Sequence, residues 1–252
     1  PMKLTKQEWQ DLNNRLLMAL RPLTNPVAIK MIDSPEGFEE YGDLKMATNP
    51  STGCQIIGIA AHFHMTIGIK PEKFLTTYCG ANCGCCERDE EWHDGVLLAN
   101  PPYPWHGNQD ASRAHMESYL DTLPEKPYAG MVASPLDDND IAEPDCISVQ
   151  IQASGAFHLL AGLIEADFQY LEFPFRGESQ CVDTWMRTIK TGKPGLSLGC
   201  RGDRALGNLQ SGEVRVTLTC EQFVKAIEGV ENLINRGVDY PYFAPIMLPD
   251  NV

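Results

Sequence analysis

Residues 146–164 read CISVQIQASGAFHLLAGLI, a run of 19 residues without a formal charge that contains two different patterns. Apolar and polar residues alternate as far as Gln152, as they do in a half-buried strand. From about Ala153 the apolar residues recur at helical spacing instead. The run therefore predicts a strand at 146–151 that leads into a helix at 154–166, a unit typical of α/β architecture.

Similar patterns recur on both sides of this run, and the two kinds of element are interspersed rather than grouped apart. The predicted helices cover residues 4–20, 54–65, 110–123, 179–191 and 221–235. The predicted strands cover residues 26–32, 74–78, 96–99, 128–133, 168–173, 196–198 and 213–218, with an extended tail at 240–245. This order predicts an α/β protein (or an intermixed α+β one) with mixed sheets and helices packed on them.

The chain of 252 residues, 43% of them hydrophobic, is long enough to form a single domain with a sizeable core. Two halves, about 22–134 and 135–252, show a similar order: a buried helix, a strand and a cysteine (Cys79 or Cys181), then a strand that begins with Gly95 or Gly195. This order leaves two interpretations open: an internal pseudo-repeat, or a chance match of the kind any α/β chain offers. A true repeat would place the two cysteines near a common pseudo-axis.

The charge balance excludes several classes of partner. There are 20 Lys and Arg against 34 Asp and Glu, a net charge of −14, which argues against nucleic acids and anionic membrane surfaces. The uncharged runs 46–69 and 146–164 are as long as a membrane span, but His62 and Gln150 would be costly in lipid. No signal peptide is recognisable at the start. We therefore expect a cytoplasmic protein with no membrane or nucleic-acid partner; a homo-oligomer is left open.

Cysteine is the most informative residue type. Nine cysteines, an odd number in a chain without a recognisable export signal, favour metal binding or thiol chemistry over disulfides. Four of them lie in the segment 78–88, YCGANCGCCER, where two glycines allow sharp turns that let several sulfur atoms converge on one point. These candidate metal ligands are Cys79, Cys83, Cys85 and Cys86.

The spacing of these four cysteines favours an iron–sulfur cluster, 4Fe-4S above all, over zinc. A single zinc ion prefers two separated Cys pairs, and only Cys83 and Cys86 form such a pair, whereas a cluster accepts ligands from one irregular loop. Cys79, Cys83 and Cys86 also match the C-x3-C-x2-C spacing of radical S-adenosylmethionine enzymes, but Cys85 replaces the aromatic residue that those enzymes place there. Structural zinc and metal-free thiols are the alternatives.

Two further residues are candidates for catalysis. Arg201 lies with Arg204 in the glycine-rich segment 199–204, GCRGDR, where a guanidinium could bind a carboxylate or phosphate. The alternative interpretation is a helix start with surface arginines. His106 follows the cysteine segment in a loop, as does His93, and either could act as an acid or base near neutral pH. The other histidines are interpreted as hydrogen-bonded core or partner residues.

Several separated motifs, in a fixed order, resemble a prokaryotic family known as domain of unknown function 169. They are residues 26–30 (PVAIK), 35–37 (PEG), Cys54, 79–81 (CGA), 145–149 (DCISV), 177–183, 199–204 (GCRGDR) and 240–241. The resemblance spans about residues 16–245. It implies that Cys54, Cys79, Cys181 and Cys200 bind a cofactor buried between the halves. Cys83, Cys85 and Cys86 then supply a second centre or displace one of these ligands.

Together these observations predict an iron–sulfur protein of anaerobic redox metabolism. As an enzyme it would be an oxidoreductase or a cluster-dependent lyase, acting on a small anionic organic substrate held by Arg201 or Arg204. The alternatives are a metal or cluster carrier, an electron-transfer subunit with a redox partner protein, or a protein with structural zinc.

Overall fold

The computed structural model describes residues 3–42, 44–101 and 103–238, and within these ranges seven strands form one sheet in the order β2-β3-β4-β1-β5-β7-β6. The strands are β1 (Val27–Ile32), β2 (Lys45–Met46), β3 (Ile67–Ile69), β4 (Gly130–Pro135), β5 (Cys146–Gln152), β6 (Gly195–Ser197) and β7 (Glu213–Leu218). The β2–β3 pair is parallel and the other pairs are antiparallel. The predicted α/β class with a mixed sheet is confirmed.

The centre of the sheet is the β1–β5 pair. Ile29 of β1 lies opposite Ala133 of β4 on one side and Cys146 of β5 on the other. Strands from the first part of the chain, β1 to β4, therefore form one side of the sheet, and β5 to β7 form the other. The two predicted halves meet along this pair; the pseudo-repeat itself stays a prediction.

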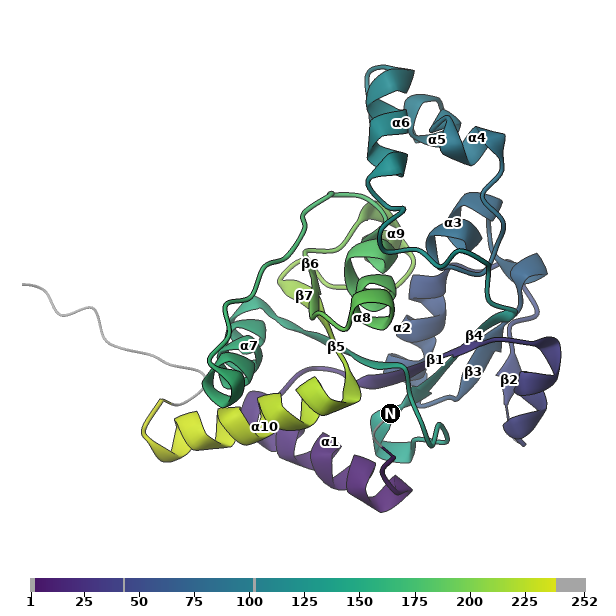
Figure 1. The fold of residues 1–252 in the computed structure, drawn as a ribbon. Coiled ribbons are helices and arrows are strands. Elements are labelled where there is room, and N and C mark those ends of the chain that lie inside the picture. Colours follow the sequence, from purple (N-terminus) through teal and green to yellow (C-terminus); the bar gives the residue numbers. More distant parts are fainter. Residues whose placement is uncertain (1–2, 43, 102, 239–252) are drawn as a thin grey trace, which may run out of the picture.

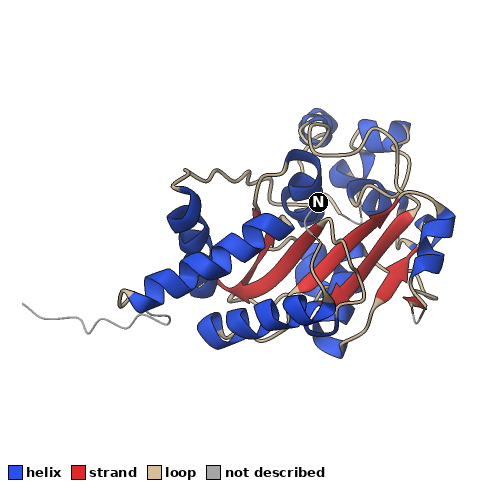
Figure 2. Cartoon of the chain, turned by 60° about the horizontal axis from the view of Figure 1, so that its bottom comes forward, coloured by secondary structure: helices blue, strands red, loops and turns tan. Residues whose placement is uncertain are grey.

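Helices cover both faces of the sheet (Figures 1 and 2). Successive residues of a strand point to opposite faces, so Ala28 and Ile32 of β1 enter one hydrophobic cluster and Ile29 and Met31 enter the other. The first cluster is completed by α1 (Lys6–Leu20), α7 (Ala153–Asp167) and α10 (Cys220–Asn235). The second contains residues of α2 (Gly53–Phe63), α3 (Thr77–Asn82) and the π-helix η4 (Val182–Met186).

The remaining elements are short. A group of three helices lies together beside α3 at one end of the molecule (Figure 1): α4 (Glu90–His93), α5 (Val96–Ala99) and α6 (Gln109–Glu117). Trp92 of this group donates from Nε1 to Asn82 Oδ1 over 2.7 Å, which fixes the group against α3. The others are η1 (Pro35–Glu40), η2 (Pro71–Lys73), η3 (Leu136–Asp138), α8 (Arg187–Thr191) and α9 (Arg201–Ala205).

Three predicted strands are wrong. Residues 96–99 form helix α5, since a short apolar run has no periodicity that separates strand from helix. In residues 74–78 only Phe74 pairs, in an isolated bridge with Ser51. The chain then turns into α3 because the Thr76 side chain caps that helix. Residues 168–173 pair with no strand in the described ranges; Phe168, in the left-handed region, ends α7.

The other predicted elements are confirmed, the strand 213–218 with its exact bounds and the rest with shifted ends, except for two. Residues 179–191 form the π-helix η4 followed by α8 rather than one regular helix. The extended tail predicted at 240–245 lies outside the described residues. Strands β2 and β3 were not predicted. Within the described ranges, every helix is too short or too polar to span a membrane.

Candidate functional site

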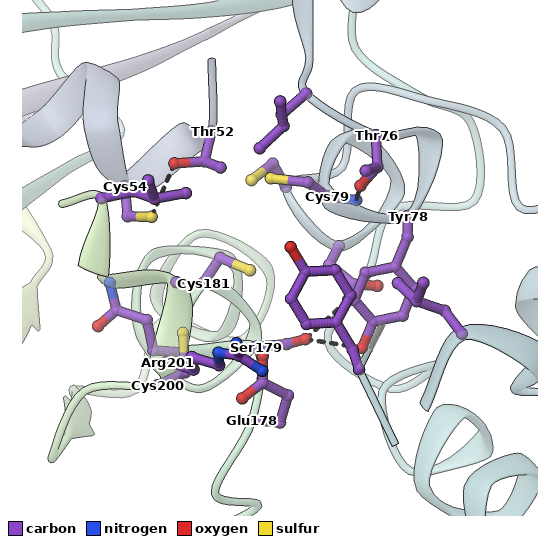
Figure 3. A pocket seen from close by; sticks show the side chains of 18 of the residues that line it. Thr52, Cys54, Thr76, Tyr78, Cys79, Glu178, Ser179, Cys181, Cys200 and Arg201 are labelled. Atoms are coloured by element: carbon purple, nitrogen blue, oxygen red, sulfur yellow. Dashed lines mark hydrogen bonds between the residues drawn. The ribbon is translucent and has the colours of Figure 1, made fainter. Parts of the chain in front are cut away.

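A cavity of about 250 Å³ lies among α2, α3, η4 and α9. Five thiols line it, those of Cys54, Cys79, Cys83, Cys181 and Cys200. Figure 3 labels four of them, and the sulfur atoms of Cys54, Cys79, Cys181 and Cys200 border a shared space in that view. Residues from both parts of the chain thus build one wall rich in sulfur.

Helix caps position the first two of these thiols. Thr52 caps α2: its Oγ1 accepts from Gln55 N over 3.1 Å, and Gln55 Oε1 accepts from Thr52 N over 2.9 Å. The same Oγ1 lies 3.0 Å from Cys54 Sγ in the first turn of the helix. Thr76 caps α3 by accepting from Cys79 N over 3.1 Å. Each cap fixes the start of the helix that carries a cavity thiol.

Cys79, Cys83 and Cys181 line the same cavity, and the pKa values of Cys79 and Cys83 depend on their neighbouring thiols. The hydrogen bond from Cys83, together with the backbone N–H of Gly53, lowers the pKa of Cys79 against the effect of burial. Hydrogen bonding to Cys181 and Cys79, followed by burial, raises the pKa of Cys83. A Cβ at Gly53 would lie 2.5 Å from Cys83 Sγ, so glycine is required here for the sulfur to reach this position.

Cys54 and Cys200 flank a second glycine. A Cβ at Gly202 would lie 3.7 Å from Cys200 Sγ and 4.0 Å from Cys54 Sγ, so the missing side chain leaves space beside both sulfur atoms. Burial raises the pKa of Cys200 to about 12, and the nearby backbone N–H groups of Gln180 and Asp203 oppose this shift. Burial likewise raises the pKa of Cys54.

The other cysteines lie outside this wall. Cys85 Sγ points to the Cys83 carbonyl oxygen at 3.5 Å, and Cys86 Sγ points to that of Pro71 at 3.6 Å. Cys146 is in the core on β5, and Cys220 begins α10. The structure thus brings the four cysteines that the resemblance implies to one cavity, and Cys83 lines the same cavity. Across the described ranges, no group of three or more His, Cys, Asp and Glu residues is arranged to hold a metal ion.

Arg201 and Arg204 have different roles. Arg201 lines the cavity, and its guanidinium lies over the ring of Tyr103, 5.1 Å from the centroid. Arg204 instead donates to backbone carbonyl groups of Leu198, Leu209, Gln210 and Glu213. The guanidinium of Arg204 therefore holds its own loop together, and only Arg201 is available to a ligand in the cavity.

His106 lies at the end of a hydrogen-bonded chain that reaches the cavity segment. Its Nε2 is 2.7 Å from His115 Nδ1, and His115 Nε2 is 2.9 Å from the hydroxyl of Tyr119. That hydroxyl donates to the carbonyl oxygen of Glu178 over 3.2 Å. A role of His106 in catalysis would thus act through His115 and Tyr119. His93 is exposed, with its ring against that of Trp92.

Sequence reasoning missed a polar group beside the thiols. Glu178, Ser179 and Gln180 line the cavity immediately before Cys181. Ser179 Oγ accepts from Asn82 Nδ2 over 2.8 Å and lies 3.0 Å from the Tyr78 hydroxyl, which ties this segment to α3. The available signal was their position within the motif 177–183; nothing in their spacing marks them as site residues.

The comparisons with known proteins are consistent with one another. Residues 15–229 match the family DUF169, described as uncharacterised ArCR. An uncharacterized protein of Methanocaldococcus jannaschii is 25% identical over 228 residues, which is 87% of this chain and 93% of that protein. No solved structure matches the chain. The matched range contains all five thiols of the cavity.

Proposed function

Because the chain belongs to the DUF169 family and its separated cysteine motifs meet at one cavity, we propose that it is an iron–sulfur protein. Its 4Fe-4S cluster would be held by Cys54, Cys79, Cys181 and Cys200. The observation that carries this proposal is the convergence of thiols from four separate segments on a cavity of about 250 Å³. Cysteine thiolates are the usual ligands of such clusters.

The surroundings of these thiols fit anionic sulfur ligands. Nearby backbone N–H groups, that of Gly53 for Cys79 and those of Gln180 and Asp203 for Cys200, act to lower the pKa values of these two thiols. Hydrogen bonds to sulfur are among the factors that set the potential of a bound cluster. Gly202 leaves room beside Cys54 and Cys200 that any other residue would fill. The donor set and the space beside it therefore suit a cluster.

A cluster fits better than a single zinc ion. Zinc draws all of its thiolates to about 2.3 Å from one point, so thiols from four separate segments would have to close in on a single atom. A cluster spaces its thiolates further apart, because each one binds a different iron. The four cysteines from separate segments are also favoured as ligands over the four cysteines of segment 78–88. Of the latter, Cys85 and Cys86 do not line the cavity, and their thiols point to backbone carbonyl groups.

An enzyme is a better interpretation than a carrier. Cys54, Cys181 and Cys200 are buried, whereas a carrier would present its thiols at the surface. Arg201 supplies a cation at the cavity, and Leu98 and Tyr103 supply apolar surface for an organic substrate. A cluster held by all four thiolates would supply an electron, whereas a Lewis-acidic iron would be available only if one of the four irons bound no thiolate. The proposed reaction class is that of an oxidoreductase or lyase in anaerobic, cytoplasmic metabolism.

Anaerobic purification tests this proposal. We expect brown protein with absorption near ~400 nm, together with stoichiometric iron and acid-labile sulfide. Cys181→Ser should lower the iron content strongly, while Cys86→Ser and Cys220→Ser, matched substitutions outside the cavity, should keep it. Colourless protein with stoichiometric zinc would refute the proposal. Iron lost from Cys86→Ser and kept by Cys181→Ser would place the cluster on the segment 78–88 instead.

A further inference from the structure

One side of the cavity carries buried polar atoms that its thiols do not satisfy. Gln180 is 2% exposed, and neither atom of its amide has a hydrogen-bond partner in the described chain. The indole N–H of Trp185, a residue that is 0% exposed, has none there either. Both residues line the cavity. Because buried polar groups in native proteins are almost always paired, these atoms indicate a ligand that brings its own donors and acceptors.

The same side of the cavity carries two opposite charges. Glu178 lines the cavity, and its carboxylate oxygen Oε2 is buried without a partner among the described residues. The Arg201 guanidinium contacts the ring of Tyr103. In the described structure no ion pair joins Glu178 and Arg201, although both side chains line the cavity and lie near one another in Figure 3. A negatively charged and a positively charged side chain are thus both available to one small molecule.

We infer that this cavity binds an α-amino acid. Its ammonium group would be held by Glu178 Oε2 and its carboxylate by Arg201. The Gln180 amide offers a donor and an acceptor for the same two groups. A simple anion would be repelled by Glu178, and a simple amine by Arg201, so the pair selects a zwitterion. This inference rests on the proposed function in one respect, since it places the amino acid beside the cluster as the substrate.

The rest of the wall selects the side chain of the ligand. Apolar groups of Leu75, Leu97, Leu98 and Leu206 line the cavity with the thiols. An apolar side chain would bury its surface there, whereas a charged one would lose its hydration without a partner. The ligand class is therefore an amino acid with a medium-sized apolar side chain, for which L-leucine is a suitable probe.

Calorimetric titration of the full chain with L-leucine tests this inference. Two analogues each lack one charge: 4-methylpentanoate has no ammonium group, and 3-methylbutylamine has no carboxylate. We expect L-leucine to bind and both analogues to bind at least tenfold more weakly. Glu178→Gln and Arg201→Gln should each weaken L-leucine binding at least tenfold. Glu125→Gln and Lys126→Gln, matched changes at exposed positions, should leave it unchanged.

The titration is run on both metal-free and anaerobically isolated protein, with circular dichroism as the check on folding. Failure of folded protein to bind L-leucine in either form overturns the inference. So does 4-methylpentanoate binding as tightly as L-leucine, because the site would then recognise only an anion. Iron content separates the two proposals. Cluster-loaded protein that does not bind L-leucine refutes only the amino-acid site. Anaerobically isolated protein that binds L-leucine but contains no iron refutes only the cluster.

Discussion

Asp203 and Arg215 form an ion pair between side chains that are 0% and 1% exposed, with Oδ1 and Nη2 2.9 Å apart. Arg215 belongs to the central part of β7, and its guanidinium also donates to Ser148 Oγ and Gln150 Oε1 of β5. Asp203 lies in α9, the helix for which Cys200 is the N-cap residue. The ion pair therefore fixes α9, and with it Cys200, to the sheet.

Removing the carboxylate of Asp203 should cost far more than removing a surface charge. Asp203→Ala leaves the buried guanidinium of Arg215 without its counterion, and we expect a loss of about 3–5 kcal/mol in the free energy of unfolding. Urea denaturation measures this loss. Asp110→Ala, which removes an exposed ion pair with Arg113, should cost under about 1 kcal/mol. Equal losses for the two variants would show that the buried pair does not anchor α9.

Substituting Gly53 should disturb the thiol of Cys83 specifically. The Cβ of Gly53→Ala would lie 2.5 Å from Cys83 Sγ, and overpacking of this kind costs about 1–3 kcal/mol. Adding Cys83→Ala removes the sulfur atom, so the double variant should lie close in stability to Cys83→Ala alone. Thermal denaturation of Gly53→Ala, Cys83→Ala and the double variant, compared with the unsubstituted protein, completes a double-mutant cycle. Additive losses would mean that the two positions are not in contact.

Stability should depend on His115 in mildly acidic solution. Burial, and then repulsion from His106 and Arg176, lowers the pKa of His115 from 6.5 to about 4. Between these values the unfolded chain binds a proton that the folded chain does not, so the contribution is complete above about pH 6.5 and is lost as the pH falls towards 4. His115→Gln should show a flatter dependence of unfolding free energy on pH in this window. A proton NMR titration of His115 with a midpoint near 6.5 would contradict the assignment.

The crossing of α7 and α10 should tolerate no side chain at its closest point. A Cβ at Gly229 would overlap the carbonyl oxygen of Gly162, so Gly229→Ala must push the two helices apart. We expect a loss of at least about 1 kcal/mol, despite the better helix propensity of alanine. Gly212→Ala, at a position with open space around it, provides the comparison in thermal denaturation. A more stable Gly229→Ala variant would show that the helices do not meet here.

Long or strongly periodic segments were predictable from sequence. The strand 213–218 was predicted with its observed bounds, and the apolar face of 221–235 predicted α10 to within one residue. The four-residue run 96–99 was not, because it is too short for its period to be measured. The strands at 45–46 and 67–69 pair through partners far away in sequence, a kind of information that a local pattern does not contain.

The candidate site was predictable in its chemistry but not in its geometry. The density of cysteines at 79–86 indicated a sulfur-rich site, yet proximity in sequence did not place all four thiols together. Cys79 and Cys83 are four residues apart across α3 and reach the same wall, whereas Cys85 and Cys86 follow in a turn and point elsewhere. Convergence with Cys181 and Cys200 depends on tertiary packing, and only the resemblance indicated it.

The five thiols of the cavity come from both parts of the chain. Three of them precede residue 84 in the sequence, and two follow residue 180. A nascent chain that has emerged only through its first half carries three of the five cavity thiols, so under the proposed function its ligand set is incomplete. Any inorganic cargo must therefore be loaded after translation has delivered α9.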